Sequence, residues 1–303
     1  MTPLSNEILV NYQVRKTRKQ KSAFIHLIKQ HFPDLKIQEG GFPKCRNLIL
    51  GDIDTAKVVL TAHYDTCAQL PFPNFIMPKN PLVSILYSVL LVLPLFAGVF
   101  LLNLVLNFFT ADWLVHYWLS LAAYFGFLIL LIAGPANKHT VNDNTSGIVV
   151  LCELAKALEP ALQKKVAFVF FDHEETGLIG SSYFRSKYKR KMADKLLINF
   201  DCVSDGDHIL VSANKAARKQ YAALLKSAFQ PSEEKSILFA NAEKVYYPSD
   251  QIGFKKSVAV AALKHKKRIG YYMNRIHTSK DTVFEKENIK LICESVLELL
   301  KQI

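Results

Sequence analysis

The most distinctive feature of the chain is a stretch with almost no charge, from position 80 to position 137. Its only formally charged residue is Asp112, and two long apolar segments lie within it, at about 82–109 and 113–133. Crossing the hydrocarbon core of a bilayer takes about 20 apolar residues in a helix. Core helices of soluble proteins rarely run that long without a polar face. The pattern therefore predicts two transmembrane helices rather than a buried core hairpin.

The connector between the two apolar segments is so short that they form a hairpin, with both outer ends on the same side of the membrane. Lys79 and Lys138 flank those ends, whereas the connector has neither Lys nor Arg. Cytoplasmic flanks are enriched in these residues, so we expect the rest of the chain to face the cytoplasm at a cell membrane. The five cysteines, which lack a CxxC spacing, suit a reducing compartment. The hairpin insertion at 80–137 would then separate two globular parts, 1–79 and 138–303.

Outside the hairpin, short apolar runs alternate with amphipathic segments. The strands predicted from these runs lie at about 46–50, 57–62, 166–171, 196–201, 208–212 and 257–263. The predicted helices lie at 5–31, 147–158, within 174–189, and at 214–229 and 286–302. This alternation is typical of an α/β fold in which helices cover both faces of a sheet.

The charge balance is basic, with 38 Lys and Arg against 26 Asp and Glu and a formal net charge of +12. The composition excludes collagen, low-complexity disorder and a disulfide-rich mini-domain. Basic residues cluster at 15–21 and 264–268. Next to an anionic leaflet each nearby Lys or Arg would contribute about 1 kcal/mol, so we expect contact with anionic lipid, the alternative being a solvated basic face. No aromatic and basic motif of nucleic-acid-binding proteins is present, and we expect no nucleic-acid partner.

Five short polar motifs stand out, most of them where a predicted strand ends. In an open α/β sheet such residues converge beyond the carboxyl ends of the strands. Two imidazoles and three carboxylates form an oxygen and nitrogen set suited to zinc or a similar divalent ion. The candidate metal ligands are His63, Asp143, Glu175, Asp201 and His277.

The same inventory suggests how a hydrolytic site would work. If Asp143 bridges two ions, each ion receives three protein ligands and shares one water, the usual arrangement of paired hydrolytic metals. Glu174, next to Glu175, could take a proton from that water as general base. Asp65, two residues after His63, could accept the second ring N–H and fix the tautomer.

These motifs carry a resemblance to a known family. The segments are AHYDT, NDNTSG, FFDHEETGLIGS, NFDCVSDGD and IHTSKDT. In this order they resemble the co-catalytic zinc aminopeptidases, metallopeptidase family 28, which includes leucine-type aminopeptidases and glutamate carboxypeptidase. The resemblance covers most of 35–300 except the hairpin, and it implies a mixed β-sheet sandwiched between helices.

The resemblance also implies a role for each site residue. The implied metal ligands are His63 and Asp201 for one zinc, Glu175 and His277 for the other, and Asp143 between them. The implied catalytic residues are Glu174 as general base and Asp65 as the orienting acid. We therefore expect a membrane-anchored di-zinc peptidase acting on peptides, most simply an aminopeptidase, although other divalent metals would suit the same ligands.

Three other functions remain open at this point. A carboxypeptidase or other amide hydrolase would use the same metals with a different pocket. A glutaminyl-cyclase-type enzyme would use one zinc, and a catalytically silent membrane scaffold would have lost ligands, whereas this sequence retains all five. The hairpin could serve as an anchor, present hydrophobic peptides or mediate oligomerisation, and the sequence leaves the oligomeric state open.

The sequence departs from the family pattern in two places. The hairpin separates Asp65 from Asp143, where the family usually has a short loop. Some aminopeptidases carry a Tyr shortly before the last His, whereas Ile276 directly precedes it here. Cys67 and Cys202 adjoin site motifs, and we interpret them as packing residues. The candidates for contact with the substrate are Tyr246, Tyr247, Tyr271, Tyr272 and Asp250.

Overall fold

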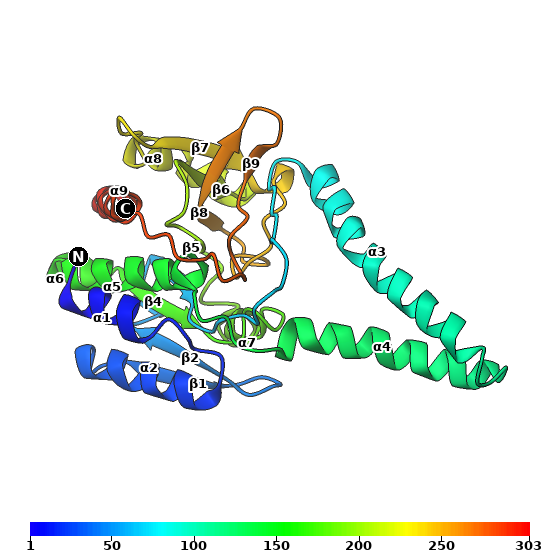
Figure 1. Ribbon diagram of the computed structural model, residues 1–303. Coiled ribbons are helices and arrows are strands. Elements are labelled where there is room, and N and C mark those ends of the chain that lie inside the picture. Colours follow the sequence, from blue (N-terminus) through cyan, green and yellow to red (C-terminus); the bar gives the residue numbers. More distant parts are fainter.

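The computed structural model describes all 303 residues, and its centre is one mixed nine-stranded sheet (Figure 1). The strands are β1 (Lys36–Gly40), β2 (Cys45–Leu50), β3 (Val58–His63), β4 (Val166–Phe171), β5 (Leu196–Phe200), β6 (His208–Ala213), β7 (Ser236–Asn241), β8 (Ser257–Lys266) and β9 (Gly270–Tyr272). Their order is β1-β2-β4-β3-β5-β8-β6-β7, with β9 paired to β8. Strand β3 is parallel to β4 and β5, so the carboxyl ends of all three open at one edge.

Helices cover both faces of this sheet. They are α1 (Pro3–Asn11), α2 (Arg18–His31), α5 (Gly147–Ala157), α6 (Pro160–Gln163), α7 (Ile179–Tyr188), α8 (Lys215–Ala228) and α9 (Lys286–Gln302), with short turns η1 (Val141–Ser146) and η2 (Ala242–Lys244). Successive residues of a strand point to opposite faces. Accordingly Val58 and Leu60 join the core beneath α1, α2, α5, α8 and α9, whereas Val59 joins the core beneath α7. The predicted α/β fold with a helix-covered mixed sheet is confirmed.

Three strands, β1, β7 and β9, were not predicted. All of them lie at margins of the sheet, each paired along one side only. An edge strand needs no continuous apolar run, because one side of its backbone faces solvent and polar residues are tolerated there. Hydrophobic patterning therefore does not mark these strands.

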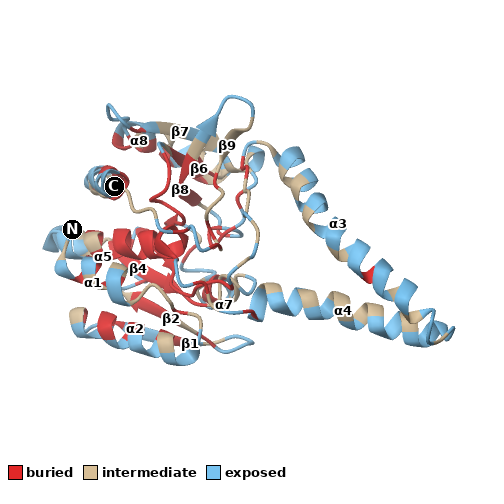
Figure 2. Cartoon of the chain, in the orientation of Figure 1, coloured by how far each residue is buried: buried red, intermediate tan, exposed pale blue.

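The apolar hairpin projects from the globular body as a V that opens toward it (Figure 1). Its arms are α3 (Pro81–Leu106) and α4 (Trp113–Ala133), close to the predicted segments. Only Val99 of these two helices is buried, and Figure 2 shows both arms as mostly exposed, with intermediate positions between the exposed ones. Both helices are long and apolar enough to cross a membrane. Their exposure is the opposite of what a core hairpin of a soluble protein would have.

The single helix predicted over 5–31 is wrong. The chain forms α1 and α2, and residues 12–17 between them are not helical. Thr17 begins α2 with a capping box, in which its hydroxyl accepts the Gln20 N–H and the Gln20 side chain accepts the Thr17 N–H. A capping box satisfies donors that a continuous helix would not leave free, so a new helix starts here.

The basic cluster at 15–21 is not a continuous exposed patch. Arg15 is fully buried, and its side chain donates to the carbonyl of Tyr64 at 2.6 Å. Lys21 is also buried, with its Nζ 2.5 Å from Oδ1 of Asp172. These two cations hold the chain onto the sheet, so they are unavailable to lipid.

Candidate metal centre

The five candidate ligands meet at the edge of the sheet where β3, β4 and β5 end. His63 is the last residue of β3, Asp201 follows β5, and Glu175 lies in the loop after β4. The turn η1 brings Asp143 to the same edge, and the loop after β9 brings His277. Residues spread over most of the chain are thus assembled by the parallel strands at the centre of the fold.

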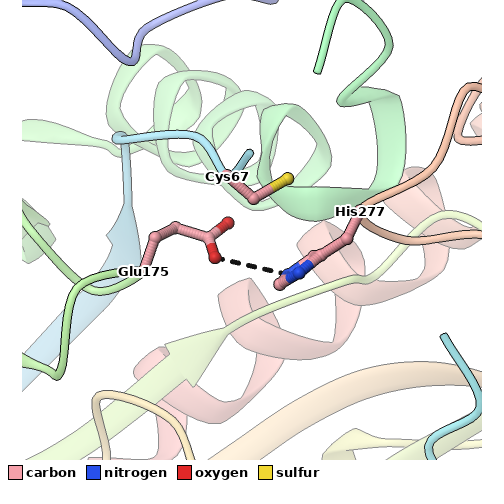
Figure 3. Close-up of side chains that lie close together, drawn as sticks. All are labelled: Cys67, Glu175 and His277. Atoms are coloured by element: carbon pink, nitrogen blue, oxygen red, sulfur yellow. Dashed lines mark ion pairs between the residues drawn. The ribbon is translucent and has the colours of Figure 1, made fainter. Parts of the chain in front are cut away.

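Asp143 lies between the two imidazoles. Its Oδ1 is 3.3 Å from Nε2 of His63, and its Oδ2 is 2.9 Å from Nε2 of His277. On one side Oδ1 of Asp201 is 3.6 Å from Nε2 of His63, and on the other Oε2 of Glu175 is 3.3 Å from Nε2 of His277 (Figure 3). The side chains therefore form two imidazole–carboxylate pairs that share one carboxylate.

The chemistry of this donor set fits bound divalent cations. The ion pairs of Asp143, Asp201 and Glu175 involve only imidazoles, with no Lys or Arg. Desolvation raises the pKa of Glu175 to about 8, and its Oε1 has no hydrogen-bond partner. Burial lowers the pKa of His277, but the Glu175 and Asp143 carboxylates outweigh it and raise that pKa to about 9. Concentrated carboxylates without a fixed cation are costly, and metal ions would compensate them.

Asp65 contacts the site differently from the sequence expectation. The second ring nitrogen of His63, Nδ1, is 3.1 Å from the backbone carbonyl of Asp65 and 3.7 Å from its carboxylate. The carboxylate instead accepts the backbone N–H of Glu174 at 2.9 Å and that of Glu175 at 3.2 Å. Asp65 thus orients the imidazole through its main chain and the loop after β4 through its side chain.

Asp281 is a site residue that the sequence reasoning missed. Its two carboxylate oxygens accept the backbone N–H groups of Asn142 and Asp143, at 2.8 and 3.0 Å. Burial raises the pKa of Asp281 to about 7. Asp281 therefore positions the turn that carries Asp143. Asp65 positions the loop after β4 in the same way, by accepting two consecutive backbone N–H groups. The only sequence signal was its place in the last motif, four residues after His277.

Two cysteines lie close to the candidate metal ligands. The Cys67 Sγ lies within 4.8 Å of ligand atoms of both Glu175 and His277 (Figure 3), and Cys202 lies similarly near Asp201. The Cys202 thiol donates to the Asp201 carboxylate at 3.1 Å. Sulfur is a good zinc donor, so Cys67, interpreted from the sequence as a packing residue, is a further candidate ligand.

Several backbone positions beside the site are in the left-handed region. His173, Cys202 and His277 have φ values of 58°, 55° and 60°. This conformation is uncommon for residues with a Cβ, and such positions tend to cluster at functional sites. Here each one is a candidate ligand or lies within two residues of one.

A pocket of about 300 Å³, hereafter the metal-site pocket, opens onto these side chains. Its lining includes the five candidate ligands and Glu174. Tyr246 and Tyr247 line it, and the Tyr247 hydroxyl donates to the Asp201 carbonyl at 3.0 Å. Tyr271, Tyr272 and the buried Asp250 are not part of the lining. Unexpectedly, Ser84 and Ser88 of α3 also line the metal-site pocket.

The helix-covered mixed sheet, with paired imidazole and carboxylate donors at its edge, defines an α/β protein of the metallopeptidase type. The family model of Peptidase family M28 matches residues 128–299, more than half of the chain. The chain belongs to this family, and the resemblance seen in the motifs is confirmed.

Individual relatives are distant or match only part of the chain. A probable leucine aminopeptidase 2 of Aspergillus oryzae is 35% identical over 82 residues, covering 26% of this chain and only 16% of that protein. A Zn-dependent exopeptidase of Parabacteroides distasonis aligns with a TM-score of 0.59 at 14% identity, over 98% of this chain and 94% of that one. The glutaminyl cyclase of Porphyromonas gingivalis aligns with a TM-score of 0.60 at 15% identity, over 99% of this chain and 96% of that one. These structures share the fold.

Proposed function

We propose that this chain is a di-zinc metallopeptidase that hydrolyses peptide bonds, of the aminopeptidase type. The observation that carries the proposal is the position of Asp143 between two imidazole–carboxylate pairs. His63 and Asp201 would hold one zinc ion, and Glu175 and His277 the other, with Asp143 shared. Membership of the peptidase family and the sequence similarity to a probable leucine aminopeptidase support this assignment.

The residues of the chain supply the proton transfer. Zinc ions held by these ligands would polarise the peptide carbonyl and make a water molecule more acidic. Glu174 lines the metal-site pocket, and desolvation there raises its pKa, which makes it a stronger base. It accepts the proton of the water and returns it to the leaving amine. Asp65, which accepts the Glu174 N–H, keeps this residue in place.

Metal content and cleavage direction test this proposal together. Protein purified in detergent without a chelator should contain about two zinc ions per chain and release the first residue of unblocked peptides. N-terminal blocking should abolish the release, and C-terminal amidation should not affect it. Release from the C-terminus would instead indicate a carboxypeptidase, and one ion would favour a mononuclear enzyme of the cyclase type. No bound metal after reconstitution would contradict the enzyme assignment.

We further propose that the hairpin anchors the chain in a cell membrane with the peptidase domain, formed by 1–79 and 138–303, in the cytoplasm. Almost none of the residues of either arm is buried, as expected of lipid-facing helices. A cation lies at each end that meets the domain. The Lys16 Nζ donates to the Ile132 carbonyl at 2.5 Å, and the Lys79 Nζ lies 5.2 Å from the Tyr271 ring. This supports a cytoplasmic, anionic leaflet on that side.

Cysteine labelling on intact cells tests the topology. Thr110→Cys, at the tip of the hairpin, should react with an impermeant maleimide, whereas Lys267→Cys, on an exposed loop of the domain, should react only after permeabilisation. The unmodified protein is a suitable background, because four of its five cysteines are buried and Cys293 is partly so. The reverse labelling pattern would place the domain outside, and protein recovered without membranes would exclude the anchor.

A further inference from the structure

One face of α3 runs from the metal-site pocket into a second cavity. Ser84 and Ser88 line the metal-site pocket. Farther along the helix, Leu91, Leu95 and Leu102 line the second cavity. These positions are separated by three, four or seven residues, so they share one face of the helix. A single helical surface therefore connects the candidate metal centre with the space inside the V.

This second cavity, hereafter the inter-helix cavity, measures about 580 Å³ and lies between α3, α4 and the segment that precedes α3. Its lining is almost entirely apolar and includes Phe72, Ala123 and Phe127 besides the leucines of α3. The segment before α3 also joins the two spaces, since Pro71 and Phe72 line the inter-helix cavity whereas the following 74–76 line the metal-site pocket. Helix α3 and the segment before it therefore line both the metal-site pocket and the inter-helix cavity.

The hairpin is attached to the site by specific contacts. The Leu70 N–H donates to the carbonyl of His277 at 2.7 Å, and Ile76 exchanges two backbone hydrogen bonds with Met273. The Phe75 ring packs on Tyr87 of α3, with ring centroids 5.2 Å apart. These contacts set the position of α3 relative to the metal centre, so the alignment of the two spaces is a property of the fold.

From this continuity we infer that the substrate is a peptide whose N-terminal residues reach the metal-site pocket and whose following residues form an apolar helix in the inter-helix cavity. The inference rests on the proposed peptidase function and names its substrate class. A polar chain would find no side-chain hydrogen-bond partners in the apolar lining of the inter-helix cavity. Within a bilayer a peptide must satisfy its own backbone groups, which a helix does. Small residues, Gly98 and Ala123, lie in the lining, where they permit close approach of a helix.

Gly98 offers a test that leaves the fold intact. A Cβ added at Gly98 meets no atom within 4 Å, so the side chain of Gly98→Leu starts in open space and extends into the inter-helix cavity. Gly126 on α4 is equally open but lies outside the lining, so Gly126→Leu is the matched control. Both variants stay apolar and replace Gly by a better helix former, which preserves membrane insertion.

Binding is measured without relying on turnover. A peptide with a polar N-terminal tripeptide, a 12-residue apolar segment and a photoreactive group in that segment is cross-linked to the full-length protein in nanodiscs. We expect adducts on Leu91, Leu95 and Phe127, reduced about tenfold in Gly98→Leu and unchanged in Gly126→Leu. Adducts spread equally over Leu93 and Phe100, which are exposed and lie outside the cavity lining, or unaffected by Gly98→Leu, would overturn the inference.

Kinetics then separate the inference from the proposed function. The ratio of kcat/KM for the long apolar peptide to that for its N-terminal tripeptide should exceed one. It should fall about tenfold in Gly98→Leu, a change typical of altered pocket contacts, and stay constant in Gly126→Leu. An equal gain for the same unblocked tripeptide carrying an alkyl amide in place of the apolar segment would overturn the inference in favour of a lipid chain. Site-specific cross-linking without hydrolysis of either peptide would support the cavity and contradict the peptidase function.

Discussion

Replacing Glu174 by Gln is expected to lower kcat by about 10²–10⁴-fold, the usual contribution of a general base, while the protein keeps its metal. Glu174 lines the metal-site pocket, but it is not part of either imidazole–carboxylate pair around Asp143. An amide preserves the shape of the side chain and its backbone hydrogen bond to Asp65, and it cannot accept a proton. The loss should therefore appear in turnover and not in metal content.

The measurement is peptide hydrolysis together with metal analysis of the same sample. Glu234→Gln is a suitable control, because Glu234 is exposed and is not part of the pocket lining, and it should leave turnover unchanged. Full activity of Glu174→Gln with metal bound would assign the proton transfer to another residue. A parallel loss of metal would mean that Glu174 contributes to metal binding.

Replacing Asp143 by Asn should remove metal and activity together. Its two oxygens contact the two imidazoles separately, so one substitution weakens both halves of the centre. We expect metal content to fall from about two ions per chain to less than one. A ligand at 1,000 times its Kd stabilises a protein by about 4.1 kcal/mol, so added zinc should raise the Tm of the unsubstituted protein and leave that of Asp143→Asn almost unchanged.

The control for this substitution is Asp194→Asn. The side chain of Asp194 is highly exposed and pairs only with Lys256, so this variant should bind zinc and gain thermal stability like the unsubstituted protein. If Asp143→Asn retained about two ions, the carboxylate would not be shared. If it lost a single ion and kept turnover, one metal would be sufficient for the chemistry.

The features that the sequence determined by itself are those carried by local patterns. The apolar hairpin was predictable because transmembrane length and the absence of charge are properties of contiguous residues. The central strands β3, β4 and β5 were predictable because strands buried on both faces are continuously apolar. His63 and Asp201 were recognisable as candidate ligands because each lies at the end of such a strand. Asp143, Glu175 and His277 were recognisable because each lies in a compact polar motif.

The tertiary structure decided everything that depends on contacts between distant parts of the chain. The cluster at 15–21 appears basic in sequence, but Arg15 and Lys21 are buried because Tyr64 and Asp172 accept their hydrogen bonds. Asp281 positions Asp143 across 138 residues, and its place in the last motif does not by itself indicate this contact.

The hairpin gives the clearest example of this division. Its sequence determined that two long apolar helices form, because this property follows from apolar side chains in series. Only the fold decided that Ser84 and Ser88 line the metal-site pocket. That placement results from hydrogen bonds that fix the segment before α3 to the loops around His277 and Met273, and it depends on long-range packing rather than on composition.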